Sequence, residues 1–240
     1  MRLTVIGCSP AWPNPGGAQS GYLVEGHGTL LLDCGPGVLA RLREREDWPS
    51  IDAIVITHWH LDHWGDLVPW AWGGMIGPGR GKEGPELWVP PGGGARLADF
   101  GTRLGWEDMF STAFEVREYA DADPFEAAGF EVTALELPHY LLQTFGLRVS
   151  DGDRTLAYSG DTGPADRLAE LAEGADLFIC EATLERPEFD GLPRGHLSAE
   201  EAIEAFSTAR ARRLLITHRP HELALDGLLE QARDGLELEL

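Results

Sequence analysis

The chain has 240 residues, of which 43% are hydrophobic and 25% charged, and its formal net charge at pH 7 is −21. This composition is ordinary for a globular enzyme and excludes fibrous and intrinsically disordered proteins. So acidic a chain repels polyanions at long range, which argues against a broad nucleic-acid-binding face. The densest basic group is predicted to be the solvated end of a helix, and it consists of Arg210, Arg212 and Arg213.

In the first half of the chain, short apolar runs separated by glycine and proline predict strands, and longer periodic runs predict helices. The strands are expected at residues 2–8, 21–26, 28–35, 51–58 and 86–91. The helices are expected at residues 37–46 and 94–105. Between them, the glycine-rich segment 73–85 is predicted to be a mobile loop.

In the second half, Asp151-Gly152 is a strong hairpin signal between two alternating strands within residues 145–163. Further strands are expected at residues 130–139, 175–183 and 212–218. Residues 196–211 predict a helix with a capping box, and its apolar face comprises Ala202, Ile203, Phe206 and Ala209. In that capping box, Ser198 is the N-cap and Glu201 follows three residues later. A short helical C-terminus completes the chain, and we expect a single domain over residues 1–240.

The three cysteines, Cys8, Cys34 and Cys180, lack C-x-x-C spacing and lie in or beside apolar runs. Buried free thiols in a reducing compartment are the simplest interpretation. The N-terminal apolar run is too short for a signal peptide. No stretch has the roughly 18 apolar residues that a membrane helix needs. We therefore expect a cytoplasmic protein with no membrane partner.

Four of the predicted strands end in a residue that can bind a metal, namely His58, His139, Asp161 and His218. Side chains on strand ends are held with little orientational freedom. A lone strand-end histidine is ordinarily structural, but the motif THWHLDH at residues 57–63 adds His60, Asp62 and His63. Imidazole and carboxylate are ligands for zinc, iron or manganese, and one ion takes about four of them. Two ions that share Asp161 would use every one of these residues.

With this motif and these strand ends, the sequence resembles the metallo-β-lactamase superfamily over nearly its whole length. The resemblance implies an α/β fold, a four-layer αββα sandwich of two mixed β-sheets flanked by helices. It also implies two divalent transition-metal ions, expected to be zinc, with manganese or iron as alternatives. One ion would lie on His58, His60 and His139, the other on Asp62, His63 and His218, with Asp161 as the bridge.

Asp33, at the end of an early predicted strand, matches a family position that usually supports the metal ligands from behind. The alternative is a helix N-cap before the helix at residues 37–46. The two interpretations are compatible.

The segments CEAT, residues 180–183, and GHLSAEEA, residues 195–202, resemble the ribonuclease Z branch and its cyclic-nucleotide phosphodiesterase relatives. In these proteins a Glu and a His form a pair beside the metals, which implies catalytic roles for Glu181 and His196, and also for Asp62. A protonated His196 could supply a proton to a departing sugar alkoxide, a contribution of about 10²–10⁴ in rate. The alternative is a buried polar pair that only anchors the start of a helix.

The superfamily hydrolyses several classes of ester and amide, so its fold does not name the reaction. The tRNA-processing members carry a long basic arm, whereas segment 73–85 is short and has only Arg80 and Lys82 as basic residues. We therefore predict a small, cyclic-nucleotide-like phosphodiester as substrate and no extended nucleic acid as partner, and we leave a homodimer open. The alternatives are a ribonuclease Z-type tRNA 3′-processing endonuclease, a lactone or thioester hydrolase, and a non-enzymatic metal-binding protein.

Aromatic residues cluster in and after the histidine motif. Packing in the core is the expected role for Trp59, Trp64, Trp70, Trp72 and Met75. One or two of them could instead line the mouth of the site and stack on a nucleobase.

Overall fold

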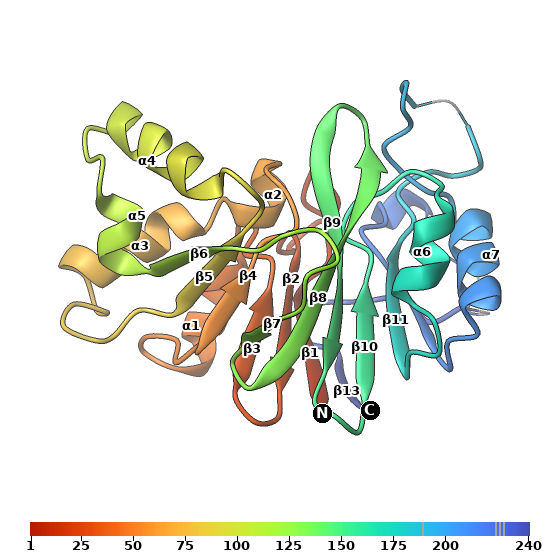
Figure 1. Cartoon of the computed structure of the whole chain (residues 1–240), viewed down its shortest axis with the longest axis horizontal. Helices are drawn as coiled ribbons and strands as arrows, with labels where there is room; N and C mark the ends of the chain where they lie inside the picture. Colours follow the sequence, from red (N-terminus) through yellow and green to blue (C-terminus); the bar gives the residue numbers. More distant parts are fainter. Residues whose placement is uncertain (189, 224, 226, 228) are drawn as a thin grey trace.

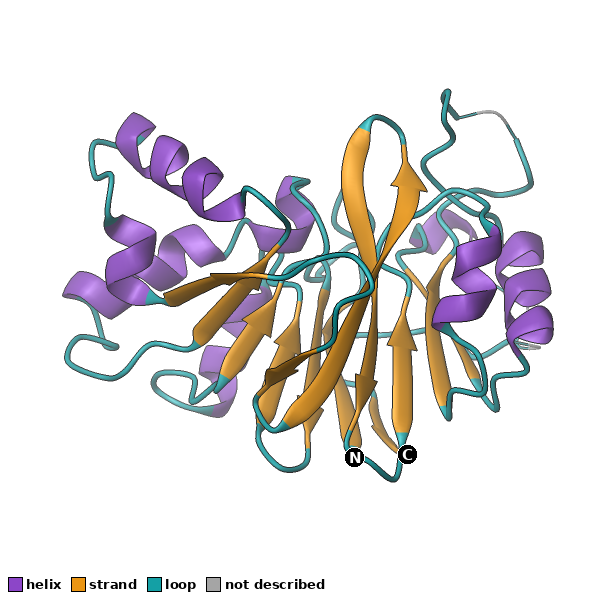
Figure 2. Ribbon diagram, viewed as in Figure 1, coloured by secondary structure: helices purple, strands orange, loops and turns teal. Residues whose placement is uncertain are grey.

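Two mixed β-sheets packed face to face form the centre of the structure, a computed structural model that describes residues 1–188, 190–223, 225, 227 and 229–240. Helices cover the outer face of each sheet (Figures 1 and 2), so the layers run helix, sheet, sheet, helix. This arrangement confirms the predicted α/β sandwich. The two termini lie close together, and the amide of Leu240 donates to the carbonyl of Met1 at 3.0 Å.

In the described part of the chain, the first sheet consists of β1 (Arg2–Gly7), β2 (Gly21–Glu25), β3 (Thr29–Leu32), β4 (Ala53–Val55), β5 (Glu86–Val89), β6 (Glu115–Glu118) and β13 (Glu237–Glu239). Their order across the sheet is β13-β1-β2-β3-β4-β5-β6. Strands β3 to β6 are parallel, whereas β13, β1, β2 and β3 pair antiparallel.

The second sheet consists of β7 (Phe125–Ala127), β8 (Phe130–His139), β9 (Leu142–Ser150), β10 (Thr155–Tyr158), β11 (Leu177–Glu181) and β12 (Leu214–Thr217). Their order is β12-β11-β10-β9-β8-β7. Strands β10, β11 and β12 are parallel, and the predicted turn at Asp151-Gly152 joins β9 and β10 as an antiparallel hairpin.

The inner strands of the first sheet, β1 to β5, are buried on both faces, which explains their nearly continuous apolar sequences. In β3, Leu30 and Leu32 face the core between the two sheets, while Leu31 faces the helices. Because successive side chains of a strand point to opposite faces, a run of leucines fills both layers at once.

Helices α1 (Val38–Arg45), α3 (Leu67–Ile76), α4 (Gly93–Arg103) and α5 (Met109–Ala113) pack on the first sheet. Helices α6 (Asp166–Leu171) and α7 (Ala199–Ala209) pack on the second. The short helix α2 (Leu61–Trp64) follows β4 and belongs to the histidine motif. The predicted capping box of α7 is confirmed, since Ser198 and Glu201 exchange both hydrogen bonds.

The prediction of a loop over residues 73–85 is wrong for its first four residues, which form the last turn of α3. Glycine is needed at Gly73 because a Cβ atom there would lie 2.1 Å from the ring of Trp48. Residues 77–85 contain no helix or strand. Mobility of this segment stays a prediction.

The predicted helical C-terminus is also wrong for the described residues. Only a single 3₁₀ turn, η1 (His221–Leu223), follows β12, and the chain then ends in β13, which pairs with β1. On α7, Ile203 is 37% exposed rather than part of the buried face, whereas Ala202 and Ala209 are buried.

The predicted burial of other residues is confirmed. All three cysteines are buried and free. Trp59, Trp64 and Trp70 are buried, and Trp72 and Met75 pack partly buried against the same cluster. Within the described residues, no helix is both long and apolar enough to span a bilayer.

Candidate metal centre

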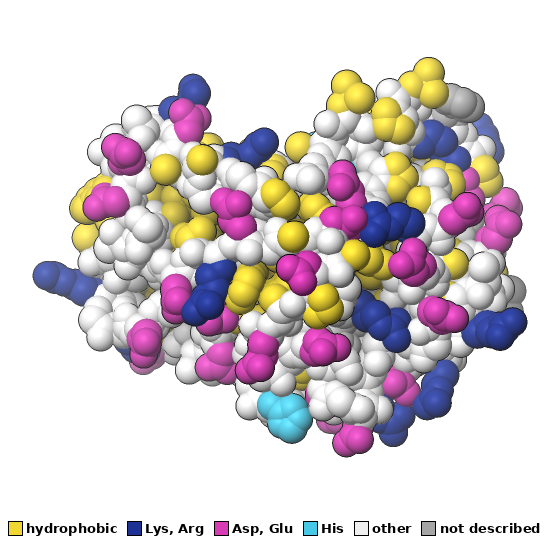
Figure 3. All heavy atoms as spheres, in the orientation of Figure 1, with side chains coloured by type: hydrophobic (Ala, Val, Ile, Leu, Met, Phe, Trp, Pro, Cys, Tyr) yellow, Lys and Arg dark blue, Asp and Glu magenta, His cyan; other side chains and the backbone are white. Residues whose placement is uncertain are grey.

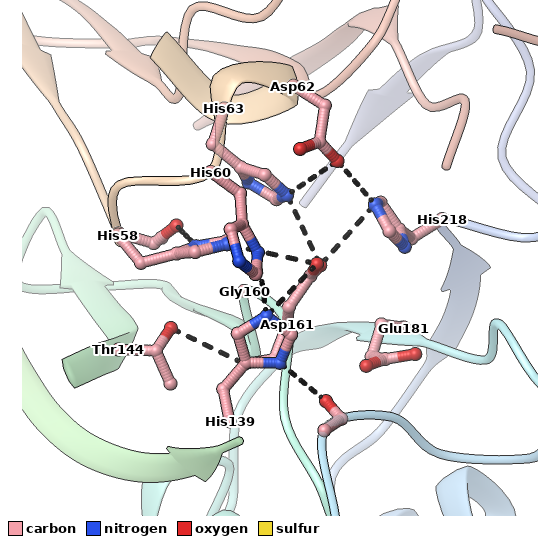
Figure 4. Close-up of polar contacts among 12 residues, drawn as sticks. His58, His60, Asp62, His63, His139, Thr144, Gly160, Asp161, Glu181 and His218 are labelled. Atoms are coloured by element: carbon pink, nitrogen blue, oxygen red, sulfur yellow. Dashed lines mark hydrogen bonds and ion pairs between the residues drawn. The ribbon is translucent and has the colours of Figure 1, made fainter. Parts of the chain in front are cut away.

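The seven predicted metal ligands come together at one edge of the sandwich, where several strands end (Figure 4). His139 is the last residue of β8, His218 directly follows β12, and Asp161 lies three residues after β10. His58 lies three residues after β4, and α2 carries Asp62 and His63. This edge lies between α2 and the projecting β8–β9 hairpin in Figure 1, and the surface is notched there in Figure 3.

The donor atoms fall into two groups that share one carboxylate. The first group is His58, His60, His139 and Asp161, and the second is Asp62, His63, Asp161 and His218. Within each group, all donor atoms lie within 4.8 Å of one another. The same division is implied by the family resemblance, with Asp161 common to both sets.

The two oxygens of Asp161 face different groups. Its Oδ2 lies 3.9 Å from Nε2 of His58 and 4.0 Å from Nε2 of His139. Its Oδ1 lies 3.3 Å from Nε2 of His63 and 3.5 Å from Nε2 of His218. One carboxylate can therefore contact an ion in each group.

Three buried polar atoms in this cluster have no hydrogen-bond partner, namely His58 Nε2, His63 Nε2 and Asp161 Oδ1. Burying a polar atom without a partner is costly, and such atoms call for an explanation. Because these three belong to the donor groups, bound cations would satisfy them, so the residues present fit a metal centre.

Hydrogen bonds behind the cluster fix which nitrogen faces it in the rings of His58, His63, His139 and His218. Thr57 Oγ1 lies 3.0 Å from Asp33 Oδ2 and 3.0 Å from His58 Nδ1. A hydroxyl that donates its one proton to a carboxylate must accept from the imidazole. His58 therefore carries its proton on Nδ1 and presents a lone pair on Nε2.

The same logic applies to His218. Thr183 Oγ1 lies 2.8 Å from Glu181 Oε2 and 2.9 Å from His218 Nδ1, so the imidazole donates to the hydroxyl. His139 Nδ1 donates to a backbone carbonyl, Gly195 O, at 2.7 Å. The Nε2 lone pairs of these histidines thus point toward the centre, as ligands require.

Asp33 supports the ligands from behind, as the resemblance implies. Its carboxylate accepts from Thr57, from Tyr158 Oη at 2.8 Å and from His63 Nδ1 at 2.7 Å. The N-cap interpretation is wrong, because α1 begins after Gly37 and has no side-chain cap. Asp33 has a left-handed backbone, with φ of 59°, and its carboxylate is bound by Thr57, His63 and Tyr158 rather than by the helix.

Glu181 and His196 form a pair beside the cluster. Oε1 of the buried Glu181 lies 2.8 Å from His196 Nδ1 and also accepts the Thr162 amide at 3.0 Å. The His196 ring lies 5.0 Å from the His139 ring and 5.8 Å from the His218 ring, between centroids. Glu181, His196 and His218 also bring three donor atoms within 4.8 Å.

The surroundings set the charge of these groups. Burial lowers the pKa of His58, His60 and His139, which favours the neutral imidazole that metals bind. Burial also opposes the charged form of His196, but the attraction and hydrogen bond of Glu181 outweigh it and raise the pKa of His196 to about 9. The pair therefore combines a carboxylate with a ring that holds its proton.

Apart from Asp33, the supporting residues were not predicted from the sequence. Thr57 directly precedes the predicted ligand His58, and Thr183 is the last residue of the CEAT segment. These positions were a signal from which their supporting role could have been predicted. Gly195 and Tyr158 come to lie beside the site only through the folding of the chain. No local sequence pattern specifies their hydrogen bonds to His139 and Asp33.

Comparisons with known proteins agree with this geometry. A family model described as the beta-lactamase superfamily domain matches residues 29–219. The uncharacterized protein ML1173 of Mycobacterium leprae is 35% identical over 237 residues, which cover 97% of this chain and 82% of that protein. Ribonuclease Z of Myxococcus xanthus is 29% identical over 287 aligned residues, with 98% and 92% coverage.

A further relative is known in three dimensions. The probable metallo-hydrolase YhfI of Bacillus subtilis is 32% identical over 234 residues, which cover 97% of this chain and 93% of that protein. Its crystal structure, described as a metallo-beta-lactamase fold protein, aligns with a TM-score of 0.83 at 27% identity over 99% of both chains. The chain therefore belongs to the metallo-β-lactamase superfamily, as a metallo-hydrolase of its ribonuclease Z-like branch.

Proposed function

We propose that the protein is a phosphodiesterase that binds two divalent transition-metal ions and cleaves small phosphodiesters of the cyclic-nucleotide kind. The observation that carries this proposal is the pair of the buried Glu181 and the partly exposed His196, which adjoins both donor groups. When bound, the ions would supply positive charge for the phosphate oxygens and make a water molecule acidic enough to attack at neutral pH. Nitrogen and carboxylate donors suit zinc first, with manganese or iron as alternatives.

The two donor groups are assigned one ion each. His58, His60 and His139 would hold the first, and Asp62, His63 and His218 would hold the second. Asp161 would contribute to both, an assignment supported by the division of its two oxygens between the groups. Asp62 is also assigned a catalytic role, because its Oδ2 contacts His218 at 3.1 Å and leaves Oδ1 to accept a proton from the attacking water.

His196 is assigned as the acid that protonates the leaving group. Its Nδ1 is taken by Glu181, so Nε2 is the nitrogen that can donate a proton to a departing oxygen. A sugar alkoxide is strongly basic and needs that proton, whereas the thiolate expelled from a thioester does not. The pair therefore supports a phosphodiester over a thioester, although a lactone, whose leaving group is also an alkoxide, stays an alternative.

Charge supports a small substrate. The chain carries a net charge of −21, and acidic side chains are interspersed among the basic ones on the face seen in Figure 3. A tRNA makes many phosphate contacts and needs an extended basic surface. The second candidate function is nevertheless tRNA 3′ processing, because the Myxococcus xanthus relative is named ribonuclease Z.

Replacing His196 with alanine tests the proposal. With zinc-loaded protein, His196→Ala should slow hydrolysis of cyclic AMP, which expels an alkoxide, by about 10²–10⁴-fold. Hydrolysis of bis(p-nitrophenyl) phosphate should fall less than about tenfold, because p-nitrophenolate departs without a proton. His27→Ala, at an exposed histidine in the loop between β2 and β3, is the matched control.

Metal content is measured in the same samples and should not change. Equal losses on both esters, or loss of metal from His196→Ala, would instead assign the Glu181–His196 pair a structural role.

A further inference from the structure

One carboxylate, that of Asp190, holds the backbone amides on the N-terminal side of His196. Asp190 accepts hydrogen bonds from the amide of His196 at 2.9 Å and from the amide of Gly195 at 3.1 Å. It also accepts the hydroxyl of Tyr140 at 3.0 Å. Asp190 therefore connects the loop before α7 with the tip of the β8–β9 hairpin.

The hairpin tip is shaped to meet this loop. Tyr140 directly follows the ligand His139 and has a left-handed backbone, with φ of 50°. Its ring packs against Gly191 and Gly195, where an added Cβ atom would lie 2.7 Å and 2.3 Å from ring carbons. Glycine at both positions therefore lets the ring approach the loop this closely.

The two segments also share main-chain bonds. The amide of Tyr140 donates to the carbonyl of Arg194 at 3.4 Å, and Nδ1 of His139 donates to the carbonyl of Gly195 at 2.7 Å. Gly195 thus makes two hydrogen bonds: its carbonyl accepts from the ring of His139, and its amide donates to Asp190. The position of His196 is linked in this way to that of His139.

The peptide of His196 is fixed on its other side as well. Arg194 donates from Nη2 to the carbonyl of His196 at 3.1 Å, and its guanidinium pairs with Glu201 at 2.6 Å. Glu201 is the capping-box residue of α7, so this side of the peptide is anchored to a helix.

We propose that Asp190 is a positioning residue for the acid His196, holding its backbone in register with the ligand His139 through the amide of His196 and the hydroxyl of Tyr140. This inference rests on the proposed role of His196. Glu181 contacts only Nδ1 of the ring, so it fixes how the imidazole is turned but not how far its backbone lies from the metal ligands. Because a shift of about 1 Å can cost as much as a hundredfold in rate, the backbone anchor matters for proton transfer.

The kinetic test compares leaving groups in zinc-loaded protein. Asp190→Ala should slow hydrolysis of cyclic AMP by at least about tenfold, while hydrolysis of bis(p-nitrophenyl) phosphate should fall less than about threefold. Tyr140→Phe, which removes one hydrogen bond to Asp190, should show the same selectivity with a smaller loss. Asp151→Ala is the matched control, because Asp151 also accepts two backbone amides, at 3.1 and 2.8 Å, but lies in the remote β9–β10 turn.

A second measurement reports on position without turnover. The proton on Nδ1 of His196, bonded to Glu181, should give a low-field NMR resonance that is absent from His196→Gln. That resonance should persist in Asp151→Ala and disappear from Asp190→Ala, because the ring no longer stays on Glu181.

The outcomes separate this inference from the proposed function. A wild-type protein that hydrolyses neither ester would defeat the phosphodiesterase proposal, and the NMR resonance would then decide the role of Asp190 alone. An active wild type whose Asp190→Ala variant loses both activities equally, or keeps the resonance, would overturn the positioning role only.

Discussion

Acidic side chains cluster at both ends of the parallel strands in the first sheet. At one of these two ends they converge with histidines to form a candidate metal site. Past the carboxyl end of β4 lies the candidate metal centre. Before its amino end lies a groove of about 820 Å³, lined by Glu46, Asp52, Glu83, Glu86, Glu115 and Glu126 together with Lys82. Binding sites in α/β sheets lie as a rule at the carboxyl ends of strands, and this molecule follows that rule.

Burial and the pairing of donors distinguish the two ends. In the groove, most of the carboxylates are exposed, and several are paired, as Asp52 is with Thr29 and Glu115 with Arg117. At the metal centre, the side chains of His58, His63 and Asp161 are buried and leave atoms without partners. The number of acidic residues therefore says little, whereas converging, unsatisfied donors indicate a ligand.

The largest expected effect is at the shared carboxylate. Because Asp161 contacts both donor groups, Asp161→Ala should release both ions. Turnover should fall by more than about a hundredfold, which is a larger loss than replacing a supporting residue causes. Elemental analysis after reconstitution with zinc measures the ions per chain. Retention of two ions by Asp161→Ala would show that Asp161 is not a bridge.

A smaller effect is expected at Asp33, which supports the donor residues from behind. Asn at position 33 keeps the shape of Asp33 but removes the charge that orients Thr57 and His63. Asp33→Asn should therefore weaken zinc binding by about 10–100-fold, as supporting residues in metal sites do. Competition with a chelator of known affinity measures this change, and an unchanged affinity would contradict the role assigned to Asp33.

The smallest effect is expected in the groove. Glu115→Gln and Glu126→Gln remove charge from exposed side chains, so turnover and zinc content should change by no more than about a factor of three. A loss of metal from either variant would show that the groove also contributes to metal binding.

The difference between the two ends of the sheet could largely be predicted from the sequence, because the proposed metal ligands directly follow apolar runs. The runs AIVIT before His58 and LLIT before His218 predict buried strands whose ends must meet at one edge. The central strands were predicted from the same apolar runs, and helices α1, α4 and α7 from their helical patterns, whereas the long helix α3 was not predicted.

Other parts of the fold leave no such signal. Strand β6 reads EVRE and β13 reads ELE, and both lie at sheet edges with exposed side chains, so no apolar pattern marks them. Helix α6 has six residues, too few for a clear helical period. The role of Asp190 depends on how a loop meets a distant hairpin, which only the tertiary structure specifies.

The measurement that tests the account most directly is turnover by the zinc-loaded protein, at physiological salt, of cyclic AMP and of a precursor tRNA side by side. A small phosphodiester carries one charge that the bound ions can neutralise, whereas a tRNA must approach a chain with a net charge of −21. We predict turnover of cyclic AMP with little or no cleavage of the tRNA. Efficient cleavage of the tRNA 3′ end, with cyclic AMP left intact, would contradict the account and assign the protein to tRNA processing.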